Sequence, residues 1–188
     1  MHWGRSVAKS IKWIFLSFTF LCTLLVGVCW LLMELAFPPH DTDEVLIQNF
    51  VDNRAIFDEI IAKVQEDSDI IRVGHNWYKL ADGISRSDAP ERIVQYRKLF
   101  KEISIDDGIQ VMYSPTGEVR VRFYSSCIGF LSPGSCKGYA YEPYPRDASI
   151  LVDSIDDFEP KAIRSSHWWI QRKIEGEDNW YLYFDSDE

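Results

Sequence analysis

Glu118-Val-Arg-Val-Arg-Phe-Tyr124 indicates the fold class, because its side chains alternate between apolar and polar from Val119 onward. A period of two is typical of a β-strand with one buried face. The segment Ile109-Gln-Val-Met-Tyr113 precedes it, and the residues between them, Ser114-Pro-Thr-Gly117, suit a tight turn. The sequence therefore predicts an antiparallel hairpin that places one face in the core.

Further strands and two amphipathic helices are predicted around this hairpin. Apolar residues recur at helical spacing over 42–66 and again from Asp88 to Ile103. Strands are expected over 70–80, 137–141 and 149–153, and a closing hairpin over 167–174 and 179–184. Two helices followed mostly by antiparallel strands predict an α+β domain, with the helices packed on one face of a mostly antiparallel β-sheet.

Residues 13–33 form a run of 21 positions without a charged side chain. At a helical rise of about 1.5 Å per residue the run is about 31 Å long, which matches the hydrocarbon core of a bilayer. Arg5, Lys9 and Lys12 precede the run, whereas acidic residues follow it. Because basic flanks stay in the cytosol, we expect a single-pass signal-anchor with a cytoplasmic N-terminus and an exported C-terminal domain.

A cleaved signal peptide, a lipoprotein leader and a buried helix are the alternatives for this run. A signal peptide has an apolar stretch of about 7–15 residues and then a small-x-small cleavage site, which Met33-Glu-Leu-Ala-Phe37 lacks. The anchor is favoured, with cleavage and lipidation left open. The expected organisation is a cytosolic stub over 1–12, a transmembrane helix over 13–33, a linker over 34–41 and an exported α+β domain over 42–188.

Charge is distributed unevenly along the chain. All 29 acidic residues follow residue 33, together with 17 of the 20 basic residues, so this part carries a net charge of −12. Such a charge argues against nucleic acid and anionic lipid as partners, because both present negative phosphate. It permits a basic protein partner, although acidity can also serve only to keep an exported domain soluble.

Two of the cysteines are expected to pair. Cys127 and Cys136 are nine residues apart in a domain that we expect to face an oxidising compartment. A disulfide between them would close a short loop and stabilise the fold by roughly 2–3 kcal/mol. Cys22 and Cys29 lie in the apolar run and are interpreted as small apolar side chains.

Aromatic residues gather in the closing hairpin. Trp168 and Trp180 are expected in the core, which leaves Trp169, Tyr181 and Tyr183 on the opposite side of the two strands. These three residues are a possible binding surface for a glycan or a protein, because Trp and Tyr combine apolar area with a polar tip. Cross-strand pairing without a binding role explains them equally well.

No motif in the sequence predicts catalysis, a metal or a cofactor. His75 and His167 lack the spacing of zinc ligands, and Cys136 has no CxxC partner. The acidic segment Asp153-Ser-Ile-Asp-Asp157 is expected to be a solvated turn. We therefore expect no enzymatic activity and no cofactor, with a hydrolase as the least favoured alternative.

Four segments of the chain carry a resemblance: Phe50-Val-Asp-Asn-Arg-Ala-Ile-Phe57, Tyr96-Arg-Lys-Leu-Phe100, Lys137-Gly-Tyr-Ala-Tyr141 and Asn179-Trp-Tyr-Leu-Tyr183. Together they resemble a family of small, uncharacterised bacterial envelope proteins that have an N-terminal anchor or a lipoprotein leader. The resemblance covers about 50–184. It implies a Gram-negative inner membrane and a periplasmic domain, and it implies no activity and no site residues.

Two functional hypotheses follow from the sequence. The first is a membrane-tethered periplasmic module that binds a protein, for example an immunity or inhibitor protein that captures a basic toxin. The second is a structural or glycan-contacting component of the cell envelope that uses Trp169, Tyr181 and Tyr183. A basic partner would be attracted by the negative charge of the domain, chiefly through faster association.

Overall fold

The computed structural model describes residues 18–28, 30–31, 39–85, 89–105, 107–114, 117–128, 134–143, 150–158 and 167–187. The chain divides into two compact units, Met1–Pro39 and His40–Glu188. In the first unit residues 18–28 and 30–31 are helical, and their large apolar side chains, including Phe20 and Trp30, are exposed. Within the described residues no helix combines the length and the apolar character needed to cross a membrane. The predicted stub over 1–12, and residues 13–17, 29, 32 and 33 of the predicted transmembrane segment, lie outside the described residues.

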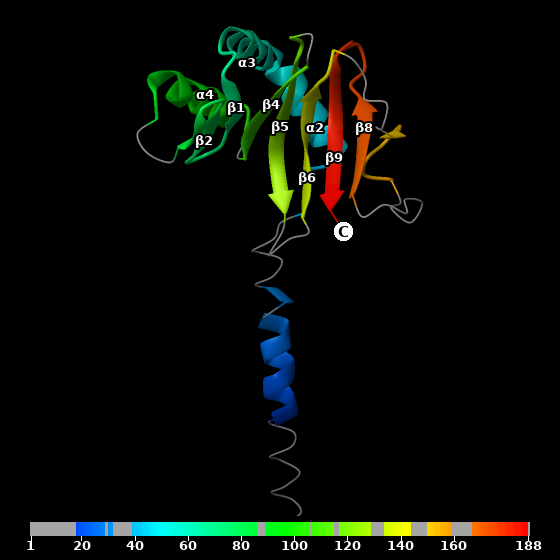
Figure 1. Ribbon diagram of the computed structural model, residues 1–188. Coiled ribbons are helices and arrows are strands. Elements are labelled where there is room, and N and C mark those ends of the chain that lie inside the picture. Colours follow the sequence, from blue (N-terminus) through cyan, green and yellow to red (C-terminus); the bar gives the residue numbers. More distant parts are fainter. Residues whose placement is uncertain are drawn as a thin grey trace, which may run out of the picture. The chain divides into compact units, whose positions relative to one another are not determined.

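The second unit is built on a nine-stranded sheet with the strand order β3-β2-β1-β4-β5-β6-β9-β8-β7 (Figure 1). Among the described strands, β7 and β8 pair in parallel and every other neighbouring pair is antiparallel. The predicted α+β class and mostly antiparallel sheet are confirmed. The strands are β1 (Ile70–Val73), β2 (Tyr78–Leu80), β3 (Gly83–Ser85), β4 (Gly108–Tyr113), β5 (Val119–Ile128), β6 (Ser135–Tyr141), β7 (Ile150–Leu151), β8 (His167–Lys173) and β9 (Trp180–Asp187).

The hairpin of β4 and β5 confirms the alternating pattern of residues 118–124. Ile109 lies opposite Phe123, and Val111 lies opposite Val121, with all four side chains buried. At the start of β4, Gly108 has a φ of +84°, and a Cβ atom there would lie 1.9 Å from the carbonyl oxygen of Val73. Only glycine therefore allows β1 to approach β4 this closely.

The helices α2 (Asp43–Asp52), α3 (Arg54–Glu66) and α4 (Glu91–Glu102) pack on one face of the sheet (Figure 1). The apolar core lies between these helices and the sheet, as predicted. At its centre the aromatic rings of Phe50, Phe57, Phe123, Tyr139 and Trp180 contact one another with centroid distances of 4.8–6.0 Å. Such packed rings contribute both buried area and specific geometry.

Two predicted elements are divided in the structure. The helix expected over 42–66 is two helices, because Asn53 leaves helical geometry with φ −115° and ψ 18°. The side-chain amide of Asn53 donates to the backbone carbonyl of Asn49 at 3.0 Å and to its side-chain oxygen at 2.8 Å. Such local hydrogen bonds compete with helical structure. The strand expected over 70–80 is a hairpin of β1 and β2, with the Gly74 amide donating to the Trp77 carbonyl at 2.9 Å.

Candidate functional site

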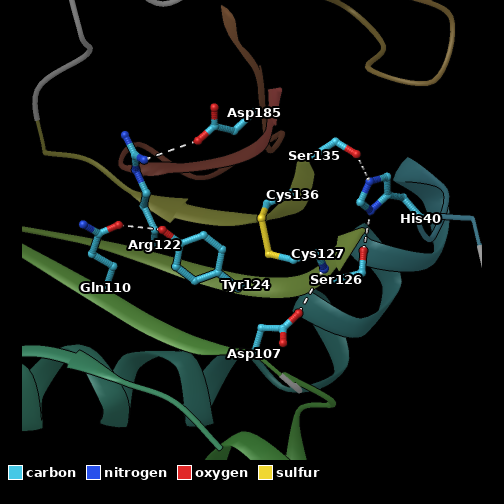
Figure 2. The surroundings of a disulfide bond; sticks show 10 residues. All are labelled: His40, Asp107, Gln110, Arg122, Tyr124, Ser126, Cys127, Ser135, Cys136 and Asp185. Atoms are coloured by element: carbon cyan, nitrogen blue, oxygen red, sulfur yellow. Dashed lines mark hydrogen bonds and ion pairs between the residues drawn. A yellow bond between two sulfur atoms is a disulfide. The ribbon is translucent and has the colours of Figure 1, made fainter. Parts of the chain in front are cut away.

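The disulfide links the two central strands β5 and β6. Cys127 and Cys136 lie directly opposite each other, their Cα atoms are 4.2 Å apart, and their sulfur atoms are bonded (Figure 2). The predicted disulfide is therefore confirmed. Asp107 supports this end of β5, since its carboxylate accepts a hydrogen bond from the Cys127 amide at 3.0 Å.

His40, the first residue of the second unit, connects the same two strands beside the disulfide (Figure 2). Its Nδ1 is 2.6 Å from the Ser126 hydroxyl, and its Nε2 is 2.9 Å from the Ser135 hydroxyl. Burial lowers the pKa of His40 below its ordinary value of 6.5, and the positive charge of Lys137 lowers that pKa further. The neutral ring, with one donor and one acceptor nitrogen, matches a hydroxyl on each side.

An ion cluster of four residues lies where α2 begins. The Lys137 ammonium is 2.9 Å from Asp43 and 2.5 Å from Asp156, and Arg172 is 2.9 Å from the other oxygen of Asp43. Lys137 is 2 % exposed and Asp43 is fully buried. The cluster contains two acids and two bases, so its formal charges cancel. We use the name ion cluster for Asp43, Lys137, Asp156 and Arg172.

Backbone groups complete the ion cluster. The Asp43 amide, at the start of α2, donates to Asp156 at 2.6 Å, and Asp43 accepts from the Ile155 amide at 2.8 Å. Burial alone would raise the pKa of Asp43, but the hydrogen bonds from Lys137, Ile155 and Arg172 together lower that pKa below its ordinary value. Asp156 thus belongs to a tertiary contact, and the expectation that residues 153–157 form only a solvated turn was wrong for this residue.

A cavity of about 220 Å³ adjoins the ion cluster. Most of its wall is apolar, and its polar groups come from His40, Lys137 and Asp156. Each of these three already has a hydrogen-bond partner within the domain. The remaining lining residues are Ile155, Phe158, Ile170 and Phe184.

The aromatic residues predicted as a binding surface lie together on the face of the sheet opposite the main core. Trp169 stacks on Tyr183 with ring centroids 4.5 Å apart and an angle of 11° between the planes. Tyr181 belongs to the same cluster. The Arg122 guanidinium lies 3.9 Å from the centroid of the Trp169 ring and 3.7 Å from Asp185, an ion pair drawn in Figure 2.

These aromatic side chains are buried. Trp169 and Tyr181 are each 6 % exposed and Tyr183 is fully buried, so they present no open platform in this structure. Binding through them stays a prediction, and it would require the residues that bury them to move. Trp180 lies in the core as expected, whereas the side chain of Trp168 lies outside the described residues.

The outer face of α2 and α3 carries a concentration of exposed acids, which we call the acidic helix face. Its exposed apolar residues are Val45 and Val51, at 53 % and 60 % exposure. The basic residues of these helices are Arg54, which pairs with Asp58 and Glu177, and Lys63, which pairs with Glu59. The exposed acids of these helices are Glu44, Asp52, Asp58, Glu59 and Glu66, and Asp41 is exposed just before α2.

The described residues contain no group of three or more His, Cys, Asp or Glu side chains that is arranged to hold a metal ion. His75 lies on the exposed turn between β1 and β2, away from the disulfide in sequence and in strand order. The side chain of His167 is outside the described residues. The expectation that the protein is not an enzyme stays a prediction.

Comparison of the chain with known proteins leaves its family open, since no family model, no curated protein and no solved structure matches it. The resemblance to small envelope proteins is therefore an expectation from the sequence alone.

Sequence reasoning missed the ion cluster, although one signal for it was present. In 137–141 the alternation places Lys137 on the same face as Tyr139 and Tyr141, and therefore toward the core. A lysine in that position requires buried acids as partners. The pattern does not say which acids these are, because Asp43 and Arg172 are 129 residues apart.

Proposed function

We propose that this chain is a membrane-tethered envelope protein without catalytic activity, whose second unit binds a basic protein partner through the acidic helix face. The uncharged run over 13–33 and the basic residues before it support the tether. The charge of the acidic helix face supports a basic protein as the class of partner.

One observation carries the proposal: α2 and α3 have five exposed acids and only two basic residues, and both basic residues are already paired. A surface of this kind keeps a strong negative potential after all internal pairing. Positive patches on a partner are therefore attracted, and the association rate rises as salt is lowered.

Val45 and Val51 give the acidic helix face its apolar contact area. Both lie beside exposed acids on the outer side of α2, and both are more than half exposed. Specific interfaces usually combine an apolar centre with a polar rim. In this proposal the two valines contribute apolar contacts, and Glu44 and Asp52 contribute the charged contacts.

An immunity or inhibitor protein is the form of this function that fits best. A tether would hold the binding domain at the membrane, where an incoming toxin is to be intercepted. A basic toxin would be captured quickly by the acidic helix face, because charge complementarity acts mainly on the rate of association.

The test is a pull-down of envelope and secreted fractions with the full-length chain in nonionic detergent, followed by mass spectrometry. The variant carries Glu44→Lys and Asp52→Lys. The matched control carries Asp82→Lys and Glu102→Lys, which change the net charge equally at exposed positions outside α2 and α3.

We expect the wild type and the control to retain one stoichiometric basic protein, and the variant to lose it. Purified partner should associate with the wild type at a rate that falls as salt rises. If the variant still retains the basic protein, or if the control loses it to the same extent, the acidic helix face is not the binding surface.

A further inference from the structure

A second cavity, of about 270 Å³, lies between the turn that follows β1 and the end of α4. His75 comes from the turn, and Arg97 and Lys101 come from the same face of α4, four residues apart. Phe100 and Ile105 provide its apolar wall. We call these five residues the cationic hollow.

The basic side chains of the cationic hollow differ from the six basic residues of the domain that pair with acids. Arg54, Lys63, Arg92, Arg122, Lys137 and Arg172 all lie within 4.0 Å of a carboxylate. Among the described residues, no carboxylate pairs with His75, Arg97 or Lys101, and no acid lines the cavity. This is unexpected in a part of the chain whose net charge is −12.

Arg97 is held in position for binding. Its Nε donates to the Gly74 carbonyl at 3.0 Å, and the Gly74 amide in turn donates to the Trp77 carbonyl at 2.9 Å. The guanidinium is thereby tied to the turn that carries His75, and its two terminal nitrogens remain for a ligand. A guanidinium with two parallel donors matches the oxygens of a carboxylate or a phosphate.

We propose that the cationic hollow binds a small organic anion, namely a carboxylate or phosphate group carried on an apolar body. Arg97 and Lys101 bind the anionic group, His75 donates from the opposite side, and the apolar body lies on Phe100 and Ile105. A cavity of this volume has room for about nine water molecules, which is the size of a small aromatic acid or phosphate ester. This site is independent of the acidic helix face.

The cavity beside the ion cluster differs from the cationic hollow in its polar groups. Lys137 and Asp156 pair with each other there, and both nitrogens of His40 are engaged by serine hydroxyls. That cavity therefore offers a ligand mainly apolar contact. In the cationic hollow no acid among the described residues neutralises the basic groups. An anion entering the hollow therefore gains charge-assisted hydrogen bonds without breaking existing ion pairs.

Isothermal titration calorimetry on the full-length chain in nonionic detergent tests the proposal, with phenyl phosphate as the probe. Benzyl alcohol tests the need for the anion, and inorganic phosphate tests the need for the apolar body. The variants are Lys101→Gln, which changes an exposed side chain, and Arg97→Gln. The matched control is Lys98→Gln, an exposed lysine of the same helix that does not line the cavity.

We expect saturable binding of phenyl phosphate that each of Lys101→Gln and Arg97→Gln weakens by about tenfold, the effect of losing one hydrogen bond between charged groups. Lys98→Gln should bind phenyl phosphate with an affinity within about twofold of the wild type, since Lys98 acts on the site only through long-range electrostatics. Inorganic phosphate and benzyl alcohol should both bind at least about tenfold more weakly than phenyl phosphate.

Three results would overturn the proposal. Absence of saturable binding up to about 10 mM phenyl phosphate would exclude the site, since it corresponds to a binding free energy weaker than about −3 kcal/mol. Equal weakening by Lys98→Gln and Lys101→Gln would show unspecific attraction to α4. If inorganic phosphate binds as tightly as phenyl phosphate, Phe100 and Ile105 do not contribute to binding.

Discussion

The ion cluster and the cationic hollow both place basic side chains beside a cavity. In the ion cluster these side chains are paired with acids, whereas in the cationic hollow they pair with no acid that the structure describes. In the ion cluster Lys137 and Arg172 lie within 2.9 Å of acids, of which Asp43 is fully buried. In the cationic hollow His75, Arg97 and Lys101 have no carboxylate partner among the described residues. Charge that is paired inside the domain holds α2 on the sheet, whereas charge without an acid partner at the surface remains available to a ligand.

This contrast has an energetic basis. A buried ion needs a partner because desolvation costs several kcal/mol, and removing one partner leaves the other uncompensated. An exposed ion is solvated already, so changing it alters stability little. Substitutions in the two regions should therefore separate stability from binding.

The largest effect is expected from Lys137→Ala. The substitution leaves the fully buried Asp43 with one cation fewer and should lower the free energy of unfolding by about 3–5 kcal/mol. Urea unfolding followed by tryptophan fluorescence measures this change. Lys79→Ala, at an exposed position on β2, is the control and should change stability by less than about 0.5 kcal/mol. A small loss for Lys137→Ala would mean that the ion cluster does not stabilise the fold.

The disulfide should have the next largest effect, because it fixes the end of β5 and β6 beside His40 and the ion cluster. Replacing Cys127 and Cys136 with Ser should lower the free energy of unfolding by roughly 2–3 kcal/mol in the chain-entropy model. Wild-type protein with a reductant should lose the same amount, while the double variant should not respond to reductant. If reductant does not lower the free energy of unfolding of the wild type, this prediction is wrong.

His40 should have a smaller and pH-dependent effect. At about pH 7.5 His40→Ala removes two hydrogen bonds to Ser126 and Ser135, with a cost of about 1–2 kcal/mol. The folded pKa of His40 is lowered from 6.5, so the unfolded state takes up its proton first as the pH falls. The stability that depends on neutral His40 is therefore complete above about pH 6.5 and is lost as the pH falls through the folded pKa.

Urea unfolding of wild type and His40→Ala at about pH 7.5 and at about pH 5.5 measures this dependence. The difference in the free energy of unfolding between the two proteins should shrink at the lower pH. A difference that grows on acidification would mean that His40 is charged in the folded protein.

The smallest effect on stability is expected in the cationic hollow. Lys101→Gln should change the free energy of unfolding by less than about 0.5 kcal/mol, because the side chain is exposed and has no ion pair to lose. The same urea unfolding series measures it beside Lys137→Ala. If Lys101→Gln lowers the free energy of unfolding as much as Lys137→Ala does, the two regions do not differ in their contribution to stability.

Local patterns predicted much of the domain. The alternation in residues 118–124 and in the closing hairpin identified β4, β5, β8 and β9, and the nine-residue spacing suggested the disulfide. The breaks at Asn53 and at 74–77 were missed, because each depends on a local hydrogen bond that competes with the regular element. For the aromatic residues Trp169, Tyr181 and Tyr183, periodicity predicted their face correctly but could not predict that they are buried.

The sequence by itself determined the α+β class and the apolar faces of helices and strands, because these follow from periodicity, and it suggested the pairing of Cys127 with Cys136. Only the tertiary structure decided which distant charges meet, as in Asp43 and Arg172, and which basic groups stay unpaired, as in Arg97 and Lys101. The physical reason is that a local pattern fixes the direction of a side chain, whereas its burial and its partners depend on how distant segments pack.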